Sequence, residues 1–135
     1  MSSVGTDTLP IRSGKDVVLV RQAVREAALH LGFNLVDQTK IVTAASELAR
    51  NTLDHGGGGV LQIEIVSEGA GRGVRLTFQD EGPGIPDVGL ALRDGYTTGN
   101  GLGLGLGGAK RLVNEFEIES EPGRGTRVTV TRWKR

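Results

Sequence analysis

Clusters of glycine divide this chain into short segments with regular patterns. The sequence has 22 glycines among 135 residues, and most of them lie close to one another. The clusters fall at residues 56–59, 69–73, 82–84, 99–108 and 123–125. Glycine allows backbone conformations that other residues avoid, but ordering it costs more conformational entropy. The clusters therefore predict loops, and their number indicates that several loops do more than connect elements.

The first half of the chain predicts one short strand and two helices. Residues 9–12 indicate a strand, and the next four residues, Ser13 to Asp16, match a capping box with Asp in place of Glu. Apolar residues then recur at helical spacing until Gly32, which ends the helix. A second helix is predicted over residues 36–53, with Ile41, Ala45, Leu48 and Thr52 on one face.

The second half of the chain predicts two pairs of strands. Alternating apolar residues indicate strands over 60–66 and 74–78, joined by a glycine-rich turn over 68–73. Residues 80–101 lose regular pattern apart from a possible helical turn near 88–92, which is typical of a functional or disordered loop. A further helix is predicted over 102–113, and a second strand pair over 116–120 and 126–133.

This order of elements defines a fold class. Strands occur in pairs rather than in strict alternation with helices, so we expect an α+β fold. The sheet should be mixed or antiparallel, with the helices covering one face. The length of 135 residues predicts a single domain over residues 1–135.

The overall composition excludes several classes of function. The 24% of charged residues balance to a formal net charge of zero, so we expect no nucleic-acid or membrane partner. The absence of cysteine excludes disulfides and thiol nucleophiles. No apolar run approaches the ~20 residues that span a bilayer, and the polar start of the chain lacks a signal core. We therefore expect a cytoplasmic protein. The basic end of the chain is either a solvated strand face or a contact for an acidic partner.

The first candidate site lies on the predicted second helix. Glu47, Asn51 and Asp54 are spaced by four and three residues, so they share one stripe of the helix. Such a stripe beside an apolar face is most often a solvated edge. Alternatively, the Glu could accept a proton and the Asn could bind Mg²⁺, which prefers oxygen ligands.

The second candidate site follows an apolar strand. Residues 80–84 read Asp-Glu-Gly-Pro-Gly, which is also the composition of an ordinary turn. The glycines could instead let the backbone approach a flat ligand closely, and the fixed carboxylate of Asp80 could accept hydrogen bonds from an amine. Composition alone leaves both interpretations open.

The third candidate site is the long glycine run. Residues 99–108 alternate glycine with leucine and lead into a predicted helix, where exposed backbone amides favour a phosphate. The alternative is a flexible hinge. Gly103, Gly105 and Gly108 match the dinucleotide fingerprint literally, but no strand precedes them. The Walker A sequence and the catalytic loop of eukaryotic-type kinases are both absent.

In this order, the motifs resemble those of the GHKL superfamily, which includes histidine kinases, Hsp90-like ATPases and bacterial anti-sigma kinases. Residues 47–51 resemble its N box, and residues 80–84 and 99–108 resemble its first two glycine boxes. Residues 123–126 resemble its last glycine box. Each motif alone is weak, whereas four in order at compact spacing are specific.

Within that superfamily, the chain most resembles the RsbT-type serine/threonine switch kinases of the bacterial stressosome. The resemblance is carried by residues 36–39, 46–51 and 80–87 and by the short end, 131–135. It implies the Bergerat fold, a two-layer α/β sandwich with an ATP lid over residues 87–100.

The resemblance also implies cofactors and residue roles. ATP and Mg²⁺ are the expected cofactors, with Glu47 as general base and Asn51 as magnesium ligand. Asp80 would bind the adenine amine. The remaining cofactor-binding residues are Gly82, Gly84 and Thr126 around adenine, and Gly101, Leu102, Gly103, Leu104 and Gly105, whose glycines lie along the phosphates.

The implied function is a serine/threonine protein kinase. Its acceptor would be a STAS-domain partner, after which the kinase would activate a PP2C-type phosphatase, with a large stressosome assembly as a further partner. An anti-sigma factor that sequesters a sigma factor is the main alternative. A histidine-kinase fragment is weaker, because no hairpin with a phosphoacceptor histidine precedes the motifs. An ATPase without a protein substrate also remains open.

Overall fold

The elements follow the predicted order. A computed structural model describes residues 2–85 and 106–134. The elements in these two ranges are β1 Ser2–Ile11, α1 Gly14–His30, α2 Leu35–Asp54, β2 Gly59–Glu68, β3 Gly71–Asp80, α4 Leu106–Arg111, β4 Glu115–Ser120 and β5 Thr126–Lys134.

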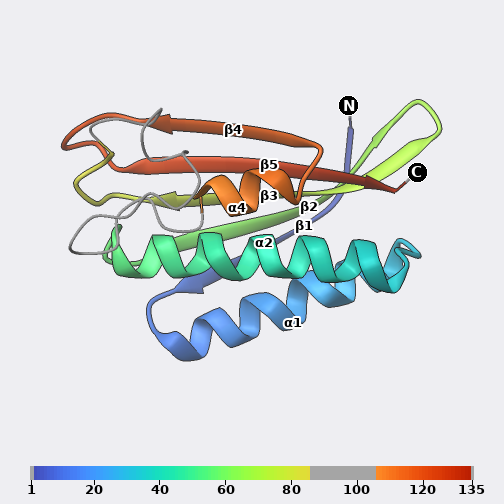
Figure 1. The fold of residues 1–135 in the computed structure, drawn as a ribbon, viewed down its shortest axis with the longest axis horizontal. Helices are drawn as coiled ribbons and strands as arrows, with labels where there is room; N and C mark the ends of the chain where they lie inside the picture. The colour runs from blue at the N-terminus through green and yellow to red at the C-terminus, as the bar shows by residue number, and fades with distance from the viewer. Residues whose placement is uncertain (1, 86–105, 135) are drawn as a thin grey trace.

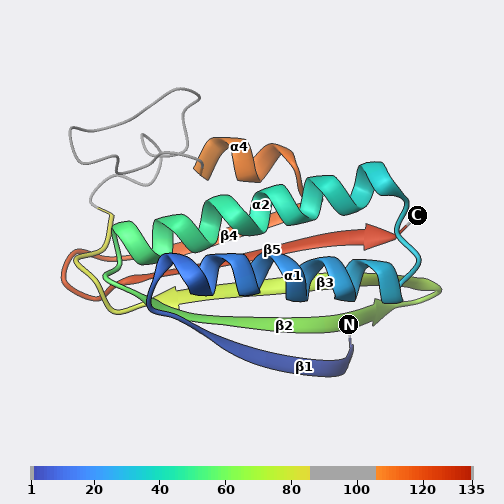
Figure 2. The same cartoon turned by 90° about the horizontal axis from the view of Figure 1, so that it is seen from below.

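The strands form one sheet covered by helices on one face. The strand order is β1-β2-β3-β5-β4, and each neighbouring pair is antiparallel. Helices α1 and α2 lie side by side against one face, with α4 on the far side of α2 (Figures 1 and 2). The predicted α+β sandwich is therefore confirmed, with an antiparallel rather than a mixed sheet.

The core lies between the sheet and the helices. Side chains alternate along a strand, so Leu61 and Phe78, which are register partners, both face the helices and are buried. The predicted face of α2 is buried as well, including Thr52, whose hydroxyl donates to the Leu48 carbonyl oxygen at 3.0 Å. That bond satisfies a polar group in an apolar layer.

The predicted capping box forms only in part. Helix α1 begins at Gly14, as expected, but the Ser13 side chain makes no capping hydrogen bond. The Asp16 carboxylate instead accepts from the Arg12 backbone N–H at 2.8 Å, one residue before the N-cap. The shorter Asp side chain thus stabilises the turn that enters the helix, without the reciprocal bond of a complete box.

Two strand boundaries differ from the prediction because backbone pairing continues where the side-chain pattern stops. Strand β1 pairs with β2 along its length and begins at Ser2 rather than at residue 9. Pairing between β2 and β3 continues to Glu68 and Gly71, so the loop is two residues long. Ladder hydrogen bonds need only backbone groups, which glycine also supplies.

The predicted helix over 102–113 is described only from Leu106, and it ends at Arg111. The chain turns there because the Asn114 N–H donates to the Thr131 carbonyl oxygen at 2.9 Å, which joins it to β5. The expected helical turn near 88–92 lies outside the described residues.

Strand β4 forms one edge of the sheet. Its Glu115, Glu117 and Glu119 are exposed, whereas Phe116 and Ile118 between them pack against the core. Glu119 pairs with Arg127 of β5 at 2.7 Å. The outer face of this edge is therefore lined with carboxylates.

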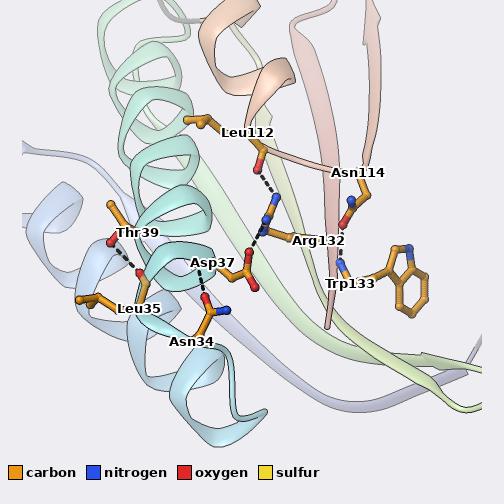
Figure 3. A network of polar contacts seen from close by, with 8 residues as sticks. All are labelled: Asn34, Leu35, Asp37, Thr39, Leu112, Asn114, Arg132 and Trp133. Atoms are coloured by element: carbon orange, nitrogen blue, oxygen red, sulfur yellow. Dashed lines mark hydrogen bonds and ion pairs between the residues drawn. The ribbon is translucent and has the colours of Figure 1, made fainter. Parts of the chain in front are cut away.

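An internal ion pair joins β5 to α2 at the end of the molecule where α2 begins. Arg132 is the register partner of Val74, so it faces the helices, where it pairs with Asp37 (Figure 3). Its Nη1 donates to the Leu112 carbonyl oxygen at 3.0 Å. The two side chains are only 14% and 27% exposed. For the basic end, the sequence suggested either a solvated strand face or a contact for an acidic partner. Arg132 fits neither, because it is mostly buried and already paired.

Replacing Asp37 with Ala should lower the free energy of unfolding by about 2 kcal/mol, because the half-buried Arg132 guanidinium would lose its counter-charge. The matched control is Glu119→Ala, which breaks an exposed pair and should cost less than about 1 kcal/mol. Urea unfolding of both variants measures the difference. Equal losses would contradict a special role for the internal pair.

Candidate functional site

One pocket brings together residues that are far apart in the sequence. Its lining residues come from the end of α2, the end of β3 and the start of β5. These three places lie at the same end of the molecule (Figure 1). The volume of the pocket is about 30 Å³, room for about two water molecules, so a larger ligand requires the walls to separate. The lining residues are Leu48, Asn51, Thr52, His55, Gly56, Phe78, Asp80, Gly84, Ile85, Leu106, Thr126 and Val128.

Asp80 is the carboxylate residue that lines this pocket. It is the last residue of β3 and only 9% exposed, and its carboxylate accepts from the Gly82 N–H at 2.9 Å. Burial raises the pKa of Asp80 above its ordinary value. Hydrogen bonds from the Gly82 and Thr126 backbone amides and the nearby His55 lower the pKa and offset part of this rise. A buried carboxylate with this support can accept hydrogen bonds from a ligand amine.

Two of the predicted glycines stand where no side chain fits. A Cβ on Gly82 would lie 2.7 Å from the Gly56 Cα. A Cβ on Gly84, whose φ is +79°, would lie 2.2 Å from the Glu121 carbonyl oxygen. The loop after β3 therefore packs directly against the backbone of two other turns, which shapes this wall of the pocket.

Asn51 and Glu47 are one helical turn apart but differ in position. Asn51 lines the pocket, whereas Glu47 is exposed and does not line it. Asp54, the third member of the predicted stripe, is also exposed. The stripe is therefore divided, with the amide facing the cavity and the two carboxylates facing solvent.

Ser120, which belongs to none of the predicted motifs, connects two loops of the site. Ser120 Oγ accepts from the Ile85 N–H at 2.8 Å and donates to the Gly125 carbonyl oxygen at 3.0 Å. It also lies 2.9 Å from Thr126 Oγ1. The loops are further joined by the Gly123 N–H, which donates to the Pro83 carbonyl oxygen at 2.8 Å.

His55 and Gly56 are two further pocket residues without a predicted role. A Cβ on Gly56 would lie 2.3 Å from the Asp80 Cγ, so this glycine allows the carboxylate to sit against the end of α2. The signal was the first glycine of the 56–59 cluster, which in the sequence predicts only a loop. His55 immediately precedes that cluster, and nothing in its spacing pointed to the pocket.

The stretch that the sequence predicts to bind phosphate, from Gly101 to Gly105, lies outside the described residues. Among residues 2–85 and 106–134, no group of three His, Cys, Asp or Glu side chains could hold a metal ion. The Asn51 amide oxygen is a hard ligand, which suits Mg²⁺ held mainly by ligand phosphates and water. The donor set on the pocket wall thus fits a metal that arrives with a nucleotide.

Within the described part of the chain, no helix has the length and apolar character needed to cross a bilayer.

A comparison with protein families identifies the fold family of this site. The family described as histidine kinase-, DNA gyrase B-, and HSP90-like ATPase matches residues 36–135. The chain belongs to this family. The match includes the ends of α2 and β3, which hold Asn51 and Asp80, and the start of β5. The GHKL fold expected from the motifs is therefore confirmed.

Curated relatives within this ATPase family include kinases and anti-sigma factors. The serine/threonine-protein kinase RsbT of Bacillus subtilis (strain 168) is 45% identical over 120 residues, covering 89% of this chain and 90% of that protein. The anti-sigma F factor of Thermoanaerobacter sp. (strain X514) is 30% identical over 119 residues, covering 84% and 82%. The expected resemblance to RsbT-type kinases is thus confirmed.

Solved structures agree with this ATPase fold. The crystal structure of the RsbU and RsbW domains of a Mycobacterium tuberculosis protein matches with a TM-score of 0.67 at 26% identity. The match covers 98% of this chain but 33% of that chain. The mycobacterial sensor histidine kinase MprB matches with a TM-score of 0.58 at 16% identity, covering 97% of this chain and 99% of that chain, which supports the fold alone.

Replacing Gly82 with Ala should destabilise the protein by about 1–3 kcal/mol, because the new Cβ would overlap the backbone of Gly56. The affinity for ATP should fall together with the stability. The matched control is Gly14→Ala at the start of α1, where nothing lies within 4 Å of the added Cβ. Thermal unfolding and nucleotide titration of both variants check this, and a neutral Gly82→Ala would contradict the packing described.

Replacing Asp80 with Asn should stabilise the ligand-free protein near neutral pH. Burial raises the folded-state pKa of Asp80 above its ordinary value of 3.8, so ionisation opposes folding at higher pH. The advantage of the variant should shrink as pH falls through the folded-state pKa and vanish below about 3.8. Urea unfolding at pH 7 and pH 3.5 measures it. A pH-independent difference would contradict this cause.

Proposed function

We propose that this chain is an ATP-dependent serine/threonine protein kinase that phosphorylates a STAS-domain partner and then activates a PP2C-type phosphatase. The observation that carries the proposal is the 45% identity to a named serine/threonine kinase across 89% of the chain. A pocket lined by Asn51, Asp80 and Thr126 supports it, because these residues come from three separate motifs that resemble those of ATP-binding kinases.

The buried end of the pocket suits an adenine ring. The Asp80 carboxylate is held by the Gly82 amide and retains acceptor capacity for an exocyclic amine. Gly84 places backbone rather than a side chain at the wall, and Gly82 packs behind it against Gly56. Leu48, Phe78 and Val128 supply apolar lining against which a flat ring can pack.

Asn51 and the glycine run supply groups that suit phosphates and a metal. Asn51 would bind Mg²⁺, and the residues from Gly101 to Gly105 would line the phosphates with backbone amides. When bound, Mg²⁺ supplies charge neutralisation at the transferring phosphoryl group. The amide of Asn51 carries no charge of its own, so its role is to orient the ion rather than to balance the phosphates.

Glu47 would act as the general base. It is exposed, one helical turn before Asn51, so a hydroxyl on another protein can reach it without entering the pocket. The acceptor hydroxyl gives its proton to the Glu47 carboxylate while its oxygen bonds to the γ-phosphorus. The bond from that phosphorus to the β–γ bridging oxygen breaks, and ADP leaves.

Labelled phosphate should pass from Mg-ATP to the candidate STAS-domain protein. Glu47→Gln should lower this transfer by about 10²–10⁴-fold while leaving ATP affinity nearly unchanged, because the amide cannot accept the proton. Asn51→Ala should lower both transfer and Mg-ATP affinity. The matched control is Glu26→Gln, an exposed glutamate on α1 that should retain full transfer. Equal transfer by wild type and Glu47→Gln would reject the role of Glu47.

The anti-sigma function is the second candidate, supported by the 30% identity to an anti-sigma F factor. It predicts a stable complex with a sigma factor that ATP or ADP alters. Sigma-factor binding, together with ATP binding but no phosphate transfer to any STAS-domain protein, would favour this function over the kinase.

A further inference from the structure

Ser120 occupies an unusual position beside the pocket, because its hydroxyl has three hydrogen-bond partners. A serine hydroxyl has one proton to donate and two lone pairs that accept. The Gly125 carbonyl oxygen can only accept, and the Ile85 N–H can only donate. The single proton of Ser120 therefore belongs to Gly125, and one lone pair belongs to Ile85.

This arrangement determines the direction of the third bond. The contact of 2.9 Å between Ser120 Oγ and Thr126 Oγ1 needs a proton from one of the two hydroxyls. All three contacts can form together only when Thr126 donates here, because the one proton of Ser120 is directed to Gly125. The Thr126 hydroxyl then has only lone pairs left for the pocket that it lines.

Two acceptors thus face the pocket from neighbouring strands. Asp80 and Thr126 are register partners on β3 and β5, and both line the cavity. Asp80 carries a carboxylate, and the Thr126 hydroxyl that donates to Ser120 keeps lone pairs that can accept from a ligand. A ring substituent between them is favoured when it donates protons and disfavoured when it only accepts.

We propose that Ser120 is a positioning residue that fixes the Thr126 hydroxyl as an acceptor and thereby makes the pocket select an amino group over a keto group on a purine ring. The inference rests on the proposed function, in that the ligand is a purine nucleotide, and adds a residue that determines its specificity. Ser120 does not itself line the pocket. It acts through Thr126.

The test compares ATP with inosine triphosphate, which carries a keto oxygen in place of the amine. The measured quantity is the ratio of the two dissociation constants, obtained by titration of the whole chain with Mg²⁺ present. Ser120→Ala frees the Thr126 hydroxyl to rotate and donate to a keto oxygen. The ratio of inosine triphosphate to ATP dissociation constants should therefore fall about tenfold. Ser13→Ala is the matched control, because the Ser13 side chain makes no capping bond, and it should leave the ratio unchanged.

Two further variants keep the test decisive if Ser120→Ala fails to fold. Thr126→Val removes the acceptor itself and should lower the ratio to a similar extent. Ser120→Thr keeps the hydroxyl and should retain the wild-type ratio. A loss of affinity by the same factor for both nucleotides in Ser120→Ala, or a wild-type ratio in Thr126→Val, would overturn the inference. A wild-type chain that binds no ATP would instead reject the proposed function beneath it.

Discussion

Direct contact between backbone segments around Asp80 is the constraint on which the candidate site depends. The loop after β3 meets the end of α2 at Gly56 and the turn before β5 at Glu121, with distances that leave no room for a Cβ at Gly82 or Gly84. Backbone packed on backbone has few alternative arrangements, because it has no side-chain rotamers to change. The surrounding backbone therefore fixes the position of the Asp80 carboxylate, which also accepts from the Gly82 N–H.

The sequence predicted the fold well where a local pattern determines the structure. The apolar face of α2 and the alternation of apolar residues in β2 and β3 predicted these elements correctly. The spacing of apolar residues along a helix or strand directly reflects which face is buried. Strand ends were less predictable, since β1 extends to Ser2 only because β2 offers it a pairing edge. The Asp16 carboxylate likewise accepts from the Arg12 N–H rather than from the N-cap N–H. Which amide it reaches depends on the backbone conformation of the turn that precedes α1.

The site was predictable in its motifs but not in its connections. Asn51, Asp80 and Thr126 belong to short patterns with a chemical meaning, and the structure brings them to one pocket. Ser120 and Arg132 had no such pattern, because Ile85 lies 35 residues from Ser120 and Asp37 lies 95 residues from Arg132. A single sequence contains no record of those distances, so only the folded chain reveals that Ser120 joins two loops and that Arg132 faces inward.

The outer edge of the sheet has a consequence for how copies of this protein meet. An exposed strand edge offers unpaired backbone groups to any other strand, and natural proteins discourage such pairing with charge. Along β4, Glu115, Glu117 and Glu119 are all exposed. Glu119 is paired with Arg127 and Glu115 accepts from the Trp133 indole, so part of this charge is compensated within the chain. Exposed charge along β4 nevertheless disfavours the addition of a strand from another copy, which would have to pack beside these side chains.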